Sequence, residues 1–526
     1  MKKNNFYILL LLFVVSITTS CKKSFDDLSI NNNKPTSVPP ALLMTGVLNN
    51  LYDAPDEQNE IVDQYYIYNY DYYGNNRYDF GSGSNYYSTL ENVARMEVEA
   101  LKSGSATLNP YSALSKFFKA YFFTKMSLQM GDIPFTQALQ GITNLHPVYD
   151  PQKTVFKTSL DLLDSANTDL KSLIAKGDNN LAGDIYYGND LKKWQKAVNT
   201  FKLRLLIELS KKEGDADLNI KQQFANIVNN KGSYPIFESE DDNLQYTFLT
   251  PTNFYPNNPG TFGYDASRKN MSSTYLGLLT DLQDPRTFIV AEPARYYVDN
   301  LGKSPTSFSS FIGADPGLDL GVMYSDAGTG KYSFLGRKYF YSSYTGEKCI
   351  QLGYAELQFN IAEASNRGWL SGDGASYYTR GIKSSIQSYN IPLTGSFTAY
   401  FYRPGSTNVA NTANYDTYSI SFDWNTYYAQ PSVNYAGNNA AGLKQILQQK
   451  YLALFRHAGL EAYFNYRRTG VPNFSTGPGT GNGTRIALRF QYPSSERSAN
   501  TNNYNDALKS QFSGNDDING IMWLLK

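Results

Sequence analysis

A tyrosine-rich stretch between Asp63 and Tyr87 carries the side chains best suited to chemistry at a surface. Nine tyrosines occur in it, interleaved with asparagine, aspartate and arginine. A phenol offers a flat apolar face and a hydroxyl that donates or accepts a hydrogen bond. Such rings beside amide, carboxylate and guanidinium groups match a ligand with one apolar face and a hydroxyl rim, such as a sugar ring. They match an extended peptide as well, so the stretch predicts a binding surface for either.

Only part of this stretch is expected to be exposed. Tyr65, Tyr66 and Tyr68 have a second interpretation, inward packing on a helix or strand. Beyond Gly74 the glycine, asparagine and serine content breaks regular structure and favours presentation at a surface. The ligand-binding residues that we predict from this stretch are Tyr72, Tyr73, Arg77, Tyr78, Tyr86 and Tyr87. Two more aromatic groups, Tyr296-Tyr297 with Phe308 and Phe311, and Trp424 with Tyr427 and Tyr428, add Tyr296 and Trp424.

Two short stretches resemble phosphate-binding and calcium-binding motifs, but each has the wrong residue at a required position. Gly328-Thr329-Gly330-Lys331 ends like a phosphate-binding loop, but Ser325 stands where the first glycine belongs. Asn515 to Gly520 begins like a calcium loop, but Lys526 occupies the twelfth position, where glutamate is required. We therefore predict no metal site and no cofactor, and a looser calcium site with oxygen ligands is the alternative that stays open.

Catalytic constellations fail as well. The only histidines, His146 and His457, are predicted to be structural residues in a loop and in a helix. We therefore predict no catalytic residue and no enzyme activity. A glycoside hydrolase is the enzyme alternative that stays open, because it needs only two carboxylates about 5–10 Å apart. A structural surface protein without a small ligand is a third hypothesis.

The overall composition excludes two other classes of function. Lysine plus arginine and aspartate plus glutamate balance at 47 each, whereas a nucleic-acid-binding domain is basic. Cys21 and Cys349 are the only cysteines, which excludes thiolate metal sites.

The first 21 residues follow the pattern of a bacterial lipoprotein leader. A basic start precedes an apolar run, Phe6 to Ile17, which is shorter than the about 20 residues that span a bilayer. Small residues then lead to Cys21. We predict a signal peptide over 1–20, lipidation of Cys21 and a flexible polar stalk over 21–40. The alternative is an ordinary signal peptide with an incidental cysteine.

Helical periodicity dominates the rest of the chain. Helices are predicted over about 90–101, 110–131, 150–177, 190–214, 220–228, 352–370, 378–389 and 443–470, the last as one helix and the longest. The helical body covers about 86–232 and 347–470, and long insertions cover about 236–346 and 391–440. The insertions show only weak alternation of apolar and polar residues, and their aromatic content argues against disorder.

Several motifs in this order resemble the SusD/RagB family, nutrient-binding outer-membrane lipoproteins of Bacteroidetes. They are Met130-Gly131-Asp132-Ile133-Pro134, Trp194 to Leu205, Asp284-Pro285-Arg286, Gly353 to Ala364, Gln449 to Gly470, and Arg489 to Glu496 with Asn500. The similarity spans essentially the whole mature chain.

The resemblance implies a mainly α fold, a single domain over 41–526 with four tetratricopeptide-like helix pairs, and insertions that form the ligand face. It places ligand residues in Tyr72–Tyr87 and about Tyr296–Tyr324. It implies a lipid-anchored protein on the outside of the outer membrane that delivers oligosaccharides to a SusC-like TonB-dependent transporter. The alternative ligand is an oligopeptide for the same kind of transporter.

Overall fold

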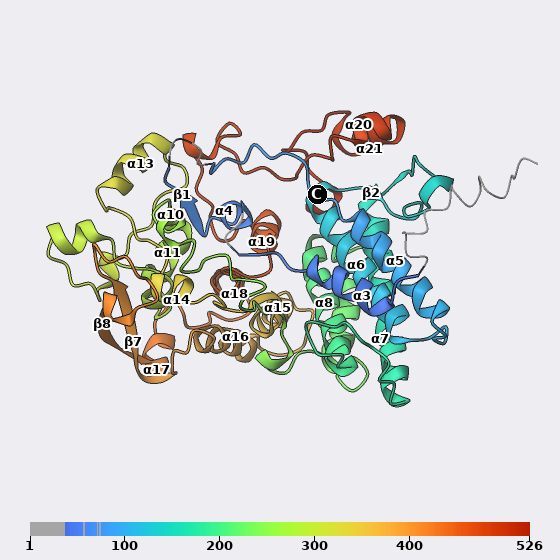
Figure 1. The fold of residues 1–526 in the computed structure, drawn as a ribbon, viewed down its shortest axis with the longest axis horizontal. Coiled ribbons are helices and arrows are strands. Elements are labelled where there is room, and N and C mark those ends of the chain that lie inside the picture. Colours follow the sequence, from blue (N-terminus) through green and yellow to red (C-terminus); the bar gives the residue numbers. More distant parts are fainter. Residues whose placement is uncertain (1–36, 56–57, 71, 73–74) are drawn as a thin grey trace, which may run out of the picture. The chain divides into compact units, whose positions relative to one another are not determined.

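Helices make up most of the regular structure in the computed structural model of this protein (Figure 1). The structure describes residues 37–55, 58–70, 72 and 75–526. The predicted signal peptide, Cys21 and most of the stalk lie outside these residues, as does Tyr73. Residues Pro40–Lys526 form one unit, whose arrangement is described below.

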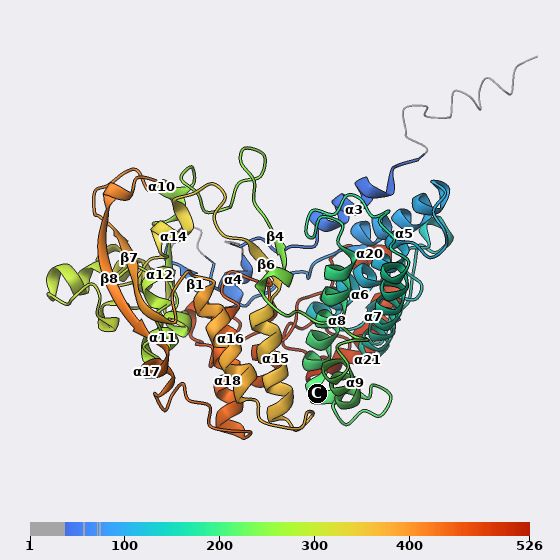
Figure 2. The same ribbon diagram turned by 90° about the horizontal axis from the view of Figure 1, so that it is seen from below.

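The first half of this unit is a stack of helices in which each packs on the next along the chain. Its members are α3 (Pro40–Asn49), α5 (Tyr87–Lys102), α6 (Pro110–Met130), α7 (Gln152–Ala175), α8 (Leu191–Glu208) and α9 (Ile220–Asn229). Figure 2 shows the same stack from below. Packing of each helix on the next along the chain is typical of tetratricopeptide-like arrays, although some connections are long here, as over 131–151 between α6 and α7.

The local sequence explains where the central helix of this stack begins. Asn109 accepts a hydrogen bond from the backbone N–H of Ser112, whose hydroxyl in turn accepts from the N–H of Asn109. Pro110 stands at the first helical position, where its missing N–H costs nothing. The helix then continues with buried side chains on nearly all sides, because α5, α7 and α8 surround it.

The second half is centred on α15 (Tyr354–Asn366), α16 (Ala375–Gln387), α18 (Ala440–Ala453) and α19 (Glu461–Thr469). Helix α15 packs on α16 and α18, and it also contacts α8 of the first stack. Both views place these helices between the stack and the insertion elements (Figures 1 and 2). The predicted mainly α fold is confirmed.

The prediction of one long helix over 443–470 is wrong. Helix α18 ends at Ala453 and α19 begins at Glu461, and α7 is the longest helix, with 24 residues. Between them Arg456, Ala458 and Gly459 adopt positive φ angles of 64°, 60° and 58°. The apolar periodicity continues across the break, so it could not reveal the break.

The first insertion consists of short elements. They are β4 (Leu244–Tyr246), α10 (Phe262–Asp265), β5 (Lys269–Met271), α11 (Ser273–Asp281), α12 (Thr287–Val290), a π-helical turn (Tyr296–Asn300), α13 (Leu320–Gly328), α14 (Arg337–Tyr341) and β6 (Cys349–Leu352). Strand β4 pairs with β6, and β5 pairs with β1 (Tyr66–Tyr68), both antiparallel. The insertion is thus joined both to itself and to the N-terminal segment.

The second insertion contains regular structure that the sequence analysis did not predict. Strands β7 (Thr394–Tyr402) and β8 (Tyr415–Asp423) form an antiparallel hairpin in unbroken register, from Thr394 opposite Asp423 to Tyr402 opposite Tyr415. Helix α17 (Trp424–Tyr428) follows β8 directly. The expectation of irregular structure in 391–440 is therefore wrong for this hairpin.

The remaining elements are short or terminal. They are α4 (Gln58–Val62), β2 (Ile133–Pro134), which pairs with β3 (Tyr149–Asp150), and α20 (Glu496–Ala499) and α21 (Thr501–Phe512) near the C-terminus.

A buried ion pair ties the first insertion to the helices. The guanidinium of Arg286 donates to Asp284 at 2.7 Å, to Ser385 of α16 at 2.7 Å and to Gln449 of α18 at 2.8 Å. Both charged side chains are fully buried. The Asp284-Pro285-Arg286 motif is thus a structural joint of the fold.

Candidate ligand-binding site

Strand β1 carries the tyrosine-rich stretch against the first insertion. Its register with β5 sets Ile67 opposite Asn270 and Tyr68 opposite Lys269. Two asparagine side chains hold the chain that follows β1. Asn69 donates to the side-chain oxygen of Asn270 at 2.5 Å, and Asn76 both donates to and accepts from the backbone of Tyr68, at 2.8 Å each. The loop after β1 is therefore fixed at both ends.

Three tyrosine rings and one guanidinium group meet at this loop. The ring of Tyr70 lies 6.4 Å from that of Tyr72 and 5.9 Å from that of Tyr324, with interplanar angles of 61° and 78°. The guanidinium carbon of Arg268 lies 4.3 Å from the centre of the Tyr70 ring. We call Tyr70, Tyr72, Arg268 and Tyr324 the tyrosine cluster. Tyr72 is 85% exposed and Tyr324 is 44% exposed, so the cluster presents rings to solvent.

Helix α13 brings Tyr324 to the cluster. Asp319 starts the helix by accepting the backbone N–H of Gly321 at 2.9 Å. Met323, in the first turn of this helix, is fully buried and packs with Ile67 of β1. The side-chain amide nitrogen of Asn76 lies 3.8 Å from the sulfur of Met323. Because Met323 is anchored on β1, the neighbouring Tyr324 stands beside Tyr70.

The predicted site residue Tyr296 is linked to the other end of the same helix. Its backbone N–H donates to the carbonyl of Gly330 at 3.0 Å, just beyond α13. Its ring lies 5.6 Å from that of Tyr297, over which the Lys303 ammonium stands at 4.9 Å. Tyr296 is half-buried and has no ring contact with the tyrosine cluster among the residues that the structure describes.

The prediction that Tyr78 contacts a ligand is wrong. This side chain is 1% exposed, and its hydroxyl donates to the backbone carbonyl of Val62 at 2.7 Å. Burial raises the pKa of the Tyr78 phenol well above its ordinary value, so the group stays a hydrogen-bond donor. Tyr78 is a core residue.

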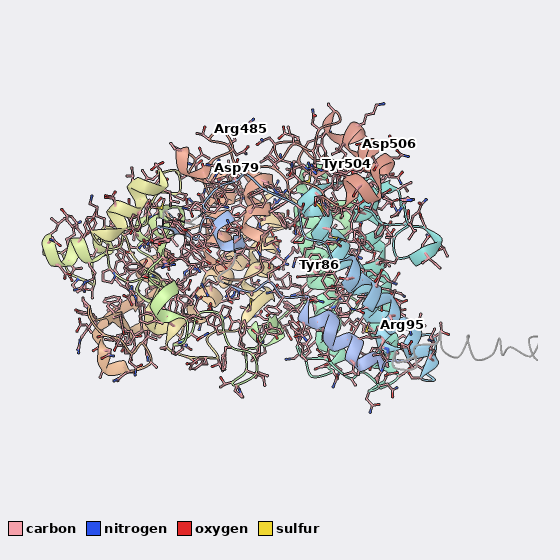
Figure 3. The ribbon with its side chains drawn as sticks, turned by 45° about the horizontal axis from the view of Figure 1, so that its top comes forward. Asp79, Tyr86, Arg95, Arg485, Tyr504 and Asp506 are labelled. Carbon is pink, nitrogen blue, oxygen red and sulfur yellow. The ribbon has the colours of Figure 1, made fainter. Side chains whose placement is uncertain are left out.

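Arg77, Tyr86 and Tyr87 make their described contacts with residues outside the tyrosine cluster. Arg77 pairs with Asp79 next to the turn at Gly481. Figure 3 shows Asp79 near Arg485 and far from Tyr86. Tyr86 packs on Phe122 of α6 at 5.2 Å with the Lys125 ammonium at 5.0 Å, and the Tyr87 hydroxyl donates to the carbonyl of Pro134 at 2.7 Å. Both tyrosines are half-buried parts of the helical stack.

Trp424 belongs to a separate stack on α17. Its ring lies 5.3 Å from that of Tyr428 at an interplanar angle of 16°, with the Lys383 ammonium at 4.7 Å. It is only 8% exposed, which leaves little surface for a ligand. Of the predicted residues that the structure describes, Tyr72 alone lies in the tyrosine cluster.

The sequence analysis missed Tyr70, Arg268 and Tyr324 as site residues. Tyr70 was part of the tyrosine-rich stretch, and Tyr324 closes the second region that the family resemblance implied. Arg268 gave no signal of its own, because its place over Tyr70 depends on the pairing of β1 with the distant β5.

Stacking and hydrogen bonding are the chemistry that this site offers. In the part of the chain that the structure describes, no group of three or more histidine, cysteine, aspartate or glutamate side chains could hold a metal ion. The described residues also include no helix with the length and apolar composition needed to cross a bilayer.

Comparison with known proteins identifies close relatives. The model of the SusD-like family, described as starch-binding associating with outer membrane, matches residues 32–493. Two SusD homologues from Bacteroides fragilis are each 30% identical, with TM-scores of 0.79 and 0.75, and each comparison covers 93% of this chain and 100% of the homologue. A chitin-binding SusD homologue from Flavobacterium johnsoniae is 19% identical, with a TM-score of 0.68 over 93% of this chain and 98% of that one. No curated protein matched.

Proposed function

Because this chain belongs to the SusD-like family of outer-membrane binding proteins, we propose that it captures oligosaccharides at the cell surface and delivers them to a SusC-like TonB-dependent transporter. Nutrient or glycan binding at the cell surface is the role that the family carries. The tyrosine cluster is the observation that supports an oligosaccharide as the ligand.

The geometry of the cluster suits successive sugar rings. Tyr72 and Tyr324 are exposed phenols that both contact Tyr70, and their planes are strongly inclined to its ring. Each ring can take the apolar face of a pyranose, while the hydroxyls and Arg268 reach the rim. An oligomer of chitin, which the Flavobacterium homologue binds, has this succession of rings. Aromatic stacking contributes about 0.5–1.5 kcal/mol per ring beyond area burial, so several rings are needed for useful affinity.

Calorimetry of the purified protein against a panel of neutral glycans and oligopeptides tests the proposal. We expect a glycan to bind and Tyr324→Ala to weaken that binding about tenfold, the equivalent of about 1.4 kcal/mol. Tyr344→Ala is the matched control, because Tyr344 is a similarly exposed tyrosine that packs on Phe254 elsewhere. Thermal unfolding of both variants should match that of the parent protein.

Other outcomes would replace the proposal. Binding of peptides but not glycans would make the protein an oligopeptide carrier. Release of shorter products from the bound glycan would indicate a glycoside hydrolase. Affinity unchanged by Tyr324→Ala would move the glycan site away from the tyrosine cluster, and failure of any TonB-dependent barrel to co-purify from the outer membrane would contradict delivery.

A further inference from the structure

A second aromatic pocket lies under the β7–β8 hairpin and shares no residue with the tyrosine cluster. It has a volume of about 360 Å³, near the lower end of the range of about 300–1,000 Å³ that is usual for small-molecule sites. Four segments line it: α12 with Phe288 and Ile289, α14 with Lys338 and Tyr339, the segment after α16 with Tyr389 and Asn390, and β7 with Phe397, Thr398 and Tyr400. We call it the hairpin pocket.

Lys338 is the one charged residue among the described residues that line this pocket. The carboxylate of Glu347, which pairs with Arg456 at 3.3 Å, lies close enough to add to the effect of burial in raising the pKa of Tyr339 and Tyr389. The neighbouring Arg337 is neutralised by the buried carboxylate of Glu292. Lys338 instead donates to the hydroxyl of Thr412 at 3.1 Å and lies 5.7 Å from the centre of the Tyr400 ring. Within the described part of the chain, Lys338 has no acidic partner, so the pocket can receive an anion.

Two phenol hydroxyls in the pocket lack protein partners. The rings of Tyr339 and Tyr389 pack at 5.3 Å, and Tyr389 is only 6% exposed. Neither hydroxyl has a hydrogen bond to any residue that the structure describes. Neither oxygen is among the fully buried, unpaired polar atoms of the described residues, so both hydroxyls reach solvent and can hydrogen-bond to polar groups of a ligand.

We propose that the hairpin pocket binds an acidic pyranose, a uronic acid residue of an oligosaccharide. The aromatic side chains take the apolar face of the ring, the two phenols meet its hydroxyls, and the Lys338 ammonium pairs with its carboxylate. A charge-assisted hydrogen bond is about twice as strong as a neutral one, so the carboxylate is the group that selects the ligand. This site is independent of the neutral-glycan site proposed for the tyrosine cluster.

Calorimetry of the full protein with trimers of galacturonate, glucuronate and mannuronate, and with their methyl esters, tests this. We expect at least one acidic trimer to bind and its ester, which lacks the charge, to bind about tenfold more weakly. Lys338→Gln should lower the affinity for the acid to that of the ester, and Lys338→Arg should retain most of it. Tyr339→Phe should weaken both ligands several-fold, because it removes only a hydroxyl.

Two control variants distinguish binding at the hairpin pocket from binding elsewhere on the protein. Lys444→Gln removes an exposed lysine on α18 that does not line the pocket, and it should leave uronate binding unchanged. Tyr324→Ala should also leave it unchanged, even where it weakens neutral glycans. No binding of any uronate trimer, equal affinity for acid and ester, or unaltered affinity in Lys338→Gln would each overturn the proposal.

Discussion

Tyrosine serves two purposes in this protein, and the hydroxyl distinguishes them. In the interior, phenols donate to backbone carbonyls of distant segments: Tyr65 to Tyr451, Tyr78 to Val62, Tyr121 to Leu51, Tyr378 to Val433, Tyr451 to Asp63 and Tyr463 to Ala487. A loop carbonyl buried without a partner would cost about 1–3 kcal/mol. Many of the 44 tyrosines therefore have a structural role.

At the surface the same side chain offers its ring. Tyr72 and Tyr324 are exposed, and both contact the ring of Tyr70, over which the guanidinium of Arg268 lies. Composition could not separate these from Tyr78, since a buried and an exposed tyrosine a few residues apart look alike in sequence. The two uses become visible only when the partner of each hydroxyl is known.

Glu363 is a buried residue whose charge the fold depends on. Its side chain is fully buried on α15, and the guanidinium of Arg468 on α19 donates to it at 2.9 Å. Burial alone would raise the pKa of Glu363, but the charge and hydrogen bonds of Arg468, helped by Arg367, lower this pKa to about 2. The folded pKa thus lies below the ordinary value of 4.5, which the unfolded chain retains.

We predict that Glu363 makes stability fall on the acid side. Its contribution is complete above about pH 4.5 and is lost as the pH falls toward 2, a change of about 3 kcal/mol in the free energy of unfolding. Glu363→Gln should cost about 3–5 kcal/mol at pH 7, because it removes the carboxylate to which buried Arg468 donates and leaves only the more distant Glu208, at 3.9 Å, as a paired acid, and it should flatten this acid loss. Urea unfolding from pH 3 to pH 7 measures both effects. Glu238→Gln, at an exposed acid, is the control, and parallel profiles of parent and Glu363→Gln would contradict the prediction.

At the scale of elements, helices and strands could be predicted from the sequence only where residues close in the chain mark them. Helices such as α6 and α8 combine apolar periodicity with caps at Asn109 and Asp190, and the sequence placed both closely. The β7–β8 hairpin was missed because a connection of twelve residues, 403–414, separates its strands and no short turn motif marks it. The pairing of β1 with β5 was equally hidden, and the tyrosine cluster depends on it.

The break between α18 and α19 gives a test of an element boundary. Gly459 has a φ of +58°, and a Cβ built there would lie 2.3 Å from a carboxylate oxygen of Asp53. That carboxylate accepts the Lys125 ammonium at 2.7 Å on α6. An alanine side chain at this position would therefore push Asp53 away from Lys125.

We predict that Gly459→Ala destabilises the fold by about 2–4 kcal/mol, through the left-handed backbone, the steric clash and the damaged ion pair. Gly470→Ala is the matched control, because Gly470 also has a positive φ, +75°, but no atom lies within 4 Å of its built Cβ. It should cost only about 1 kcal/mol. Urea unfolding of the two variants measures the difference, and equal costs would show that the contact with Asp53 does not matter.

At the scale of the whole molecule, the binding surface is assembled from regions far apart in the chain. The tyrosine cluster takes residues from the segment after β1, from the residue before β5 and from α13. The hairpin pocket takes them from α12, α14, the segment after α16 and β7. Buried arginines join these insertion elements to the helices, as Arg286 does for α16 and α18. We therefore expect ligand binding at the two proposed sites to depend on the complete fold and to be independent of the predicted N-terminal leader.

This independence leads to a prediction about Cys21, which lies outside the described residues. If Cys21 carries the lipid, Cys21→Ala should abolish incorporation of labelled palmitate. The variant should move from the membrane fraction to the soluble fraction, because only acyl chains hold the protein at the membrane. Its affinity for glycans in solution should be unchanged. Cys349→Ala is the control, since Cys349 is buried and its thiol donates to the carbonyl of Asp53. It should remain lipidated and membrane-bound. Growth on the captured glycan measures delivery, which should fail in Cys21→Ala alone. Full uptake by that variant would mean that delivery does not require a membrane tether.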